Sequence, residues 1–332
     1  MRVDDGSLVL DSAEKPGGSS PANVRAILRV GNEFFLRSID GIVQAQSGDL
    51  IAALIFTALW IGNVRHITHS AANIKFGGID TIPPDDLRRP VSVQTLSNNL
   101  QIPYETVRRY VQAMIRDNVC VRVGKRGVIV PAAVHNQPMR KRLFRDSFPS
   151  LLRFLTDLKQ AGFDYAPYRR VLASTVPLTD SGELPANGRA LLRASMELVM
   201  RGVDRIGRLN GGDFLTGMIA MSIWTANVRA ITCGRDNLKY GAMNQLPPDA
   251  LRRPVTVNSV ALTLHLPYET TRRYVSALVR DGIAQRVDGK GVIIPSAHFA
   301  QPRYYEAARE SYQDIVQTVG DLHRAGFDFS RY

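Results

Sequence analysis

The chain has 332 residues, of which 45% are hydrophobic and 22% charged, and its formal net charge is +12. This length suffices for two ordinary domains, and the composition excludes a disordered or fibrous protein. The positive charge indicates an anionic partner such as nucleic acid, with a merely soluble basic protein as the alternative.

Residues 1–20 contain acidic, Gly, Ser and Pro residues but no apolar core, so we expect a disordered tail and not a secretory signal. From residue 21 onward, adding 164 to a residue number carries the first half of the chain onto the second without a gap. The sequence Pro-Tyr-Glu-Thr, for example, occurs at 103–106 and again at 267–270. We therefore predict a duplication, with domains at 21–168 and 185–332 joined by a flexible linker at 169–184.

Each copy is predicted to begin with two helices. Apolar residues recur at helical spacing from Ile27 to Ile42, and the second copy has the same pattern. Asp49 and Asp213 then precede a second helix and are suited to cap it. This helix is apolar on nearly every side, so we expect it at the domain centre or at an interface. Its most apolar stretch, residues 51–61, is shorter than the roughly 20 residues of a membrane span.

Four further elements follow in each copy. After a short extended piece at 89–93, Ser92 or Thr256 is well placed to cap a helix at about 93–100 in the first copy or its equivalent in the second. A tight break leads to a second helix, from Pro103 in its first turn to about Asp117. Two β-rich runs around a Gly-containing turn, at 119–123 and 128–130, predict a hairpin. A last amphipathic helix is expected at about 139–160.

The order of helix, three-residue turn, helix and hairpin is that of a winged helix-turn-helix. The stretch from Ser92 to Asn118 resembles the DNA-reading segment of bacterial MarR-type and GntR-type transcription regulators, which carry a Thr-Val-Arg-like step on the second helix. The flanking helices resemble the dimerising helices of the MarR type. Pro103 and Pro267 stand where these families usually have a Ser or Thr cap, and two domains share one chain where the families usually have one. The resemblance implies a mainly α fold with small β-hairpin wings, in which tandem winged helix-turn-helix domains form a pseudo-dimer.

In such a fold the second helix offers polar side chains to base edges in the major groove. We expect Arg108 and Arg272, at the family position that often reads a base, to pair with guanine, and Arg109 and Arg273 to contact phosphate; a solvated helix face is the alternative. The other expected DNA-binding residues lie at the helix starts and the hairpin turns: Tyr104, Thr106, Tyr268, Thr270, Arg122, Lys125, Arg126, Arg286 and Lys290. Weaker candidates for phosphate contact are Arg88, Arg89, Arg252 and Arg253.

Alternatives also remain for Tyr104, for Glu105 beside it and for the hairpin turns. Tyr104 stacks on a sugar or bonds to a phosphate, or else it only packs at the helix start. Glu105 accepts from cytosine or complements the positive end of the helix dipole, and we favour the dipole. At the hairpin turns, the alternative is a charged turn that keeps the protein soluble.

These features predict a cytoplasmic, nucleoid-associated transcription regulator that binds double-stranded DNA sequence-specifically. A homodimer through the flanking helices and a small effector near Trp60 or Trp224 are further possible partners. We expect no enzyme activity, cofactor or metal, because the chain has no P-loop, Rossmann glycine pattern or His-Glu-x-x-His, and its two cysteines, Cys120 and Cys233, form no close pair. The alternatives are a plasmid- or phage-type replication initiator with paired winged helices and a winged-helix protein that binds another protein. No role is predicted for the segments 73–77 and 237–241.

Overall fold

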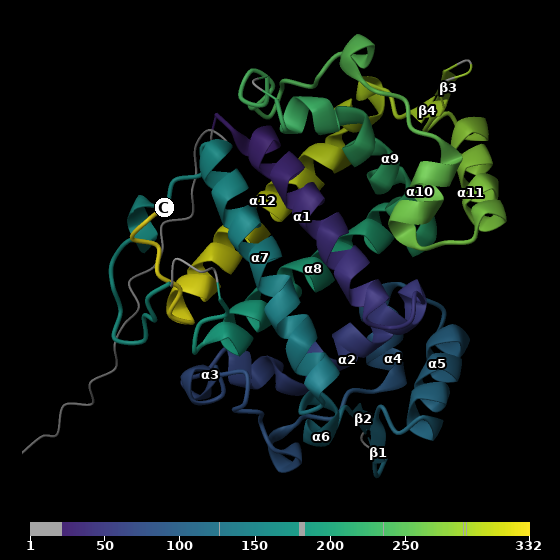
Figure 1. Ribbon diagram of the computed structural model, residues 1–332. Helices are drawn as coiled ribbons and strands as arrows, with labels where there is room; N and C mark the ends of the chain where they lie inside the picture. The colour runs from purple at the N-terminus through teal and green to yellow at the C-terminus, as the bar shows by residue number, and fades with distance from the viewer. Residues whose placement is uncertain (1–21, 126, 179–182, 235, 288, 290) are drawn as a thin grey trace, which may run out of the picture.

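The computed structural model describes residues 22–125, 127–178, 183–234, 236–287, 289 and 291–332. This part of the chain is mainly helical, with twelve α-helices and two small antiparallel hairpins (Figure 1). The mainly α fold with hairpins is therefore confirmed. The tail expected at residues 1–20 lies outside the described residues.

The longer helices and the strands occur in the same order in both halves, whereas two short helices of the first half, Ala72–Lys75 and Ala132–His135, have no α-helical counterpart among the described residues of the second. Those of the first half are α1 (Val24–Gln44), α2 (Leu50–Thr68), α3 (Ala72–Lys75), α4 (Val93–Leu100), α5 (Tyr104–Arg116), β1 (Val121–Val123), β2 (Gly127–Ile129), α6 (Ala132–His135) and α7 (Pro138–Gln160). Those of the second half are α8 (Gly188–Leu209), α9 (Phe214–Thr232), α10 (Val257–Leu264), α11 (Tyr268–Arg280), β3 (Gln285–Val287), β4 (Gly291–Ile293) and α12 (Pro302–Arg324). The bounds of α2, α4, α5, α7 and both strands recur at the predicted offset in the second half.

The predicted helix caps are confirmed. The Asp49 carboxylate accepts a hydrogen bond from the amide of Ala52 at 3.0 Å, and Asp213 caps α9 in the same way. The hydroxyl of Ser92 accepts from the Thr95 amide at 3.0 Å and so begins α4. Each cap satisfies an amide that the first helical turn leaves without a partner.

The turn between α4 and α5 differs in detail from the prediction. Pro103 lies one position before α5, in the cap position, with an extended ψ of 136°. The proline ring therefore restricts the backbone just before α5 and not within its first turn. Gln101 has a left-handed φ of 53°, which turns the chain sharply between the two helices. His265 has the same φ at the equivalent point before α11.

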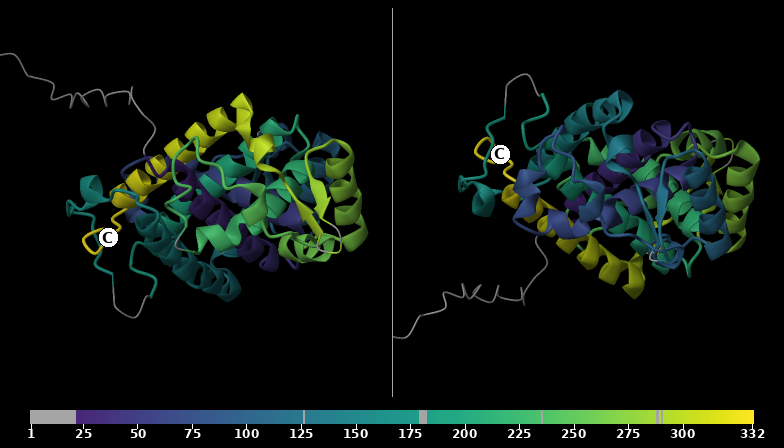
Figure 2. Two further views of the ribbon diagram at one scale, coloured as in Figure 1. Left: turned by 90° about the horizontal axis from the view of Figure 1, so that it is seen from above. Right: turned by 90° about the horizontal axis from the view of Figure 1, so that it is seen from below.

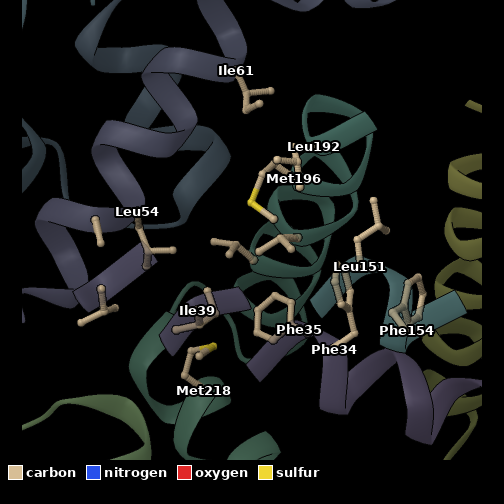
Figure 3. Close-up of a cluster of buried hydrophobic side chains, with 14 of the residues drawn as sticks. Phe34, Phe35, Ile39, Leu54, Ile61, Leu151, Phe154, Leu192, Met196 and Met218 are labelled. Atoms are coloured by element: carbon tan, nitrogen blue, oxygen red, sulfur yellow. The ribbon is translucent and has the colours of Figure 1, made fainter. Parts of the chain in front are cut away.

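A single hydrophobic core runs through both halves. α1 packs on α2 and α7 of its own half and on α9 and α12 of the other, while α8 packs on α9 and α12 and also on α2, α4 and α7. Figure 3 shows the centre, where Phe34 and Phe35 of α1 lie among side chains from several helices. The Phe34 ring stacks on that of Phe154 with centroids 4.3 Å apart. Because α1 and α8 each contact both halves, the halves interlock.

Helices α2 and α9 occupy this interior. Each is long and apolar enough to cross a membrane, but 67% of the most apolar window of α2 and 61% of that of α9 are buried inside the structure. A core helix of a water-soluble protein passes the same test of length and composition. Their burial therefore supports the predicted central position.

The segments 73–77 and 237–241, without a predicted role, lie between the halves. In the second of them, Asn237 receives hydrogen bonds from the buried guanidinium of Arg29, with Nη2 to the side-chain oxygen at 2.8 Å. Arg29 also donates to the carbonyl of Tyr240 at 2.9 Å. This segment therefore joins α1 to the opposite half.

The predicted linker is only partly as expected. The amide of Val176 donates to the carbonyl of Gly326 at 2.9 Å, and Val176 forms a parallel bridge with Phe327. Residues 169–178 are thus held against the C-terminal segment, which corrects the prediction of a free tether for that stretch. Residues 179–182 lie outside the described part of the chain.

Candidate nucleic-acid interface

Helices α5 and α11 lie along one edge of the molecule, with α4 and α10 inside them (Figure 1). The hairpins β1–β2 and β3–β4 lie near the outer ends of this edge. In both views of Figure 2, α11 is at the end of the molecule opposite the C-terminus. The two helices with the same exposed sequence are therefore presented on the same side.

The amphipathic pattern of α5 and α11 decides which side chains face outward. Val107, Val111 and Met114 are buried against the core, as are the equivalent residues of α11. This leaves the polar residues of the first turns on the outer face. Tyr104 is 42% exposed and Tyr268 49% exposed, while Thr106 and Thr270 are half-buried.

Arg108 and Arg272 each form an ion pair within their own helix. The Nε of Arg108 donates to Oε2 of Glu105 at 2.7 Å, and Arg272 donates to Glu269 at 2.8 Å. Both arginine side chains remain about half exposed, at 43% and 55%. An exposed pair at this spacing contributes about 0.2–0.5 kcal/mol, so it does not prevent the arginine from binding elsewhere. Glu105 stands in the first turn, where a carboxylate also complements the helix dipole.

Arg109 and Arg273 are exposed on the same faces. Their guanidinium carbons lie 5.6 Å and 5.9 Å from the ring centroids of Tyr110 and Tyr274. Such a cation–π contact at an exposed site contributes only about 0.5–1 kcal/mol and leaves the guanidinium hydrogen atoms free to donate. Both arginines are therefore open to an anionic ligand.

The hairpins carry further positive charge beside these helices. Arg122 on β1, Lys125 in the turn and Arg286 on β3 are exposed. Arg126 and Lys290, predicted to belong to the same set, lie outside the described residues. Gly127 enables the turn to close: its φ is 139°, and a Cβ there would come within 2.5 Å of the Val91 carbonyl oxygen. Val91 itself forms an isolated antiparallel bridge with Val128 of β2.

The position of each hairpin is fixed by an asparagine of the central helix. The side-chain amide of Asn63 donates to the carbonyls of Arg89 and Val128, at 2.8 Å and 3.1 Å, and its oxygen accepts from the Val130 amide at 2.9 Å. Asn227 makes the three equivalent bonds in the second half. Sequence reasoning missed this pair, although a polar amide inside an apolar helix in both copies was a usable signal.

Two of the predicted phosphate contacts are wrong. Arg88 and Arg252 are both 5% exposed. The Nη2 of Arg88 donates to the Pro83 carbonyl at 2.9 Å, and Arg252 donates to the Pro247 carbonyl and to Asp249. Burial lowers the pKa of both guanidinium groups. These arginines hold the loop before α4 and α10 in place, whereas their exposed neighbours Arg89 and Arg253 remain candidates.

The chemistry available at this edge is the binding of an extended anion. Each half presents exposed arginines on a helix and a basic hairpin beside it, and both rest on a buried scaffold. Among the described residues, no group of three or more His, Cys, Asp or Glu side chains could hold a metal ion. Comparison with protein-family models, with curated proteins and with solved structures finds no match to this chain.

Proposed function

We propose that each half is a winged helix-turn-helix unit and that the chain is a non-catalytic, cytoplasmic transcription regulator, which binds double-stranded DNA as a covalent pseudo-dimer. The observation that carries the proposal is the repeated, outward-facing set on α5 and α11, in which Tyr, Glu, Thr and two Arg occur at equal positions on one edge of the molecule. A helix with such a face fits the major groove.

Base recognition is assigned to Arg108 and Arg272. On binding, each guanidinium leaves the glutamate of its own helix and donates two hydrogen bonds to O6 and N7 of a guanine. The exposed ion pair that opens is worth less than the bidentate contact that forms, which discriminates against a wrong base by about 1–3 kcal/mol. Until then, Glu105 and Glu269 hold the arginines in an ordered position.

Phosphate binding is assigned to Arg109, Arg273 and the basic residues of the hairpins. These side chains position the protein along the duplex but carry little sequence information. Each neutralised phosphate releases counterions, so affinity depends steeply on salt concentration.

The interlocked core supports a fixed spacing between the two recognition helices. Because α1 and α8 pack on both halves, the helices do not separate along a free tether. We therefore expect two similar half-sites whose separation varies little, near one helical turn of DNA, or about 34 Å.

The test is selection of bound duplexes from random DNA, followed by the same selection with R108A and with R272A. Each variant is expected to relax base preference in one half-site and leave the other unchanged. R153A is the matched control, since Arg153 is an exposed arginine on α7. If R108A and R272A alter both half-sites together, or if the protein ignores duplexes at low salt, the proposal is wrong.

A further inference from the structure

Helices α5 and α11 have 13 residues each, all within the described part of the chain, and their sequences differ at only a few positions. Residues 107 and 114 differ from their counterparts, but these side chains are buried in both halves. Residue 115 and its counterpart are apolar and half-buried. The remaining difference is Gln112, which is exposed, and its counterpart Ser276. The outer faces of the two helices are therefore the same in sequence except at this position.

Gln112 shares its face with the residues assigned to DNA. Arg108, Arg109 and Gln112 follow the glutamate of the first turn at three, four and seven positions. Residues at this spacing lie on one side of an α-helix. Recognition helices of helix-turn-helix proteins contact base edges from positions with the same spacing. A helix that presents Arg108 to a base therefore presents Gln112 to the same groove.

The amide of Gln112 is available to a ligand. Among the described residues, none forms a hydrogen bond with it. Other exposed glutamines are paired within their own helices: the amide of Gln94 donates to Asn98 at 2.8 Å, and that of Gln44 donates to Asp40 at 3.0 Å. Binding through Gln112 thus breaks no hydrogen bond inside the protein.

The donor and acceptor of a glutamine amide match one base in the major groove. The amide oxygen accepts from N6 of adenine while the amide nitrogen donates to N7, and this bidentate pair identifies adenine. Gln112 lies one helical turn after Arg108, a distance of about 5–6 Å along the axis. Because successive base pairs are about 3.4 Å apart, such an adenine lies within about two base pairs of the guanine bound by Arg108.

Ser276 does not offer this contact in the second half. Its side chain is half-buried. The serine hydroxyl is attached directly to Cβ and stays close to the helix, and a single hydroxyl cannot form the bidentate pair with adenine. The second half therefore keeps the guanine contact of Arg272 without an adenine contact.

We propose that Gln112 binds an adenine in the half-site of the first half, and that the two half-sites differ at this base pair. The inference rests on the proposed DNA binding and adds the base that distinguishes one half-site from the other. The site is then asymmetric, and the first half occupies the half-site with the adenine. A dimer of identical chains presents the same surface twice, whereas a duplicated chain can present two different recognition helices.

The test is selection of bound duplexes from random DNA by the full chain. The wild type should select adenine near the guanine of one half-site only. Q112S, which matches the second half, should remove this adenine and keep both guanines. S276Q should add an adenine to the other half-site at the equivalent position. Q160S is the matched control and should keep the wild-type selection, since Gln160 is an exposed glutamine at the end of α7.

Fluorescence anisotropy then compares duplexes that differ only at this base pair. The wild type should bind the adenine duplex at least about fivefold more tightly than the others, and Q112S should bind all of them equally. An adenine preference that persists in Q112S, or a folded S276Q that gains none, would overturn the proposal. So would a loss of affinity in Q112S that is equal before and after the base change, because Gln112 would then contact phosphate or sugar.

The outcome for the proposed function is separate. If both half-sites carry a guanine that depends on Arg108 and Arg272 but neither carries the adenine, only the role of Gln112 is wrong. If the chain binds no duplex at low salt, the DNA-binding proposal and this inference both fail.

Discussion

Arg193 and Asn73 belong to different halves of the chain, and Nη2 of Arg193 donates to the side-chain oxygen of Asn73 at 2.6 Å. Arg193 is 1% exposed and Asn73 8% exposed. The same contact occurs in reverse between Arg29 and Asn237, one duplication offset away. Two equivalent, reciprocal contacts therefore join the two halves of the chain.

Asn73→Ala should lower the free energy of unfolding by about 3 kcal/mol, because it leaves a buried guanidinium without its side-chain partner. Urea denaturation followed by circular dichroism measures the change. Asn98→Ala is the control, since Asn98 is exposed on α4. A loss for Asn73→Ala no larger than that for the control would show that the contact contributes nothing to stability.

The sequence predicted well what local signals determine. Asp49 and Ser92 are caps whose effect reaches only three residues along the chain, and the predicted bounds of α4 equal the observed Val93–Leu100. The outward position of Arg108 follows from the buried stripe of its own helix. Pro103 lies one position before the first turn in which it was predicted, because proline is tolerated both in the cap and in the first turn.

Long-range contacts could not be predicted in this way. Arg88 looked like a surface cation, but it is buried by the loop carbonyl of Pro83 and by the packing around it. Val176 looked like part of a tether, but it pairs with a strand-like segment about 150 residues later. The residues next to Arg88 and Val176 in the sequence do not indicate either contact. The same is true of Asn73, whose partner lies in the other half.

Asn63→Ala should loosen the first hairpin. The change leaves the Arg89 carbonyl and the Val130 amide without the Asn63 side chain and removes one of the two hydrogen bonds that the Val128 carbonyl accepts. One unsatisfied buried group costs about 1–3 kcal/mol. Amide hydrogen exchange should therefore become faster in β1 and β2 but not in β3 and β4. Asn227→Ala is expected to give the opposite pattern. If exchange rises equally in both hairpins, or in neither, the anchoring role is wrong.

The double variant R109A/R273A should bind DNA less tightly and with a weaker salt dependence. Each phosphate contact contributes about 0.9 to the slope of log affinity against log salt, so two lost contacts reduce its magnitude by about 1.8. Fluorescence anisotropy with a labelled duplex at several salt concentrations measures the slope. R153A should leave it unchanged. An unaltered slope in the double variant would remove both arginines from the phosphate-binding set.

Because of His135, the free energy of unfolding should be lower in mild acid than at neutral pH. Burial, with the charge of Arg88 as the next cause, lowers the pKa of His135 well below its usual 6.5, so the unfolded chain takes up a proton there that the folded chain does not. Stability from this group is complete above about pH 6.5 and is lost as the pH falls, by up to about 1.4 kcal/mol per pH unit.

His135→Phe tests this, since Phe299 occupies the equivalent position in the second half. The variant should lose less unfolding free energy than the wild type between about pH 6.5 and pH 5 in urea titrations. Other titrating groups act in both proteins and cancel in the difference. Parallel pH profiles would mean that His135 is protonated equally in the folded and unfolded chains.

The interlocked core makes a prediction about the halves themselves. Residues 22–178 alone would expose the faces of α1 that pack on α9 and α12, and residues 183–332 alone would expose the faces of α8 that pack on α2 and α7. We therefore expect neither fragment to unfold cooperatively by itself, and the mixture to recover a cooperative transition as a noncovalent heterodimer. Circular dichroism melting of each fragment and of the mixture measures this. A fragment that melts cooperatively as a monomer would show that one half suffices to bury its own core and that the contacts between halves are secondary.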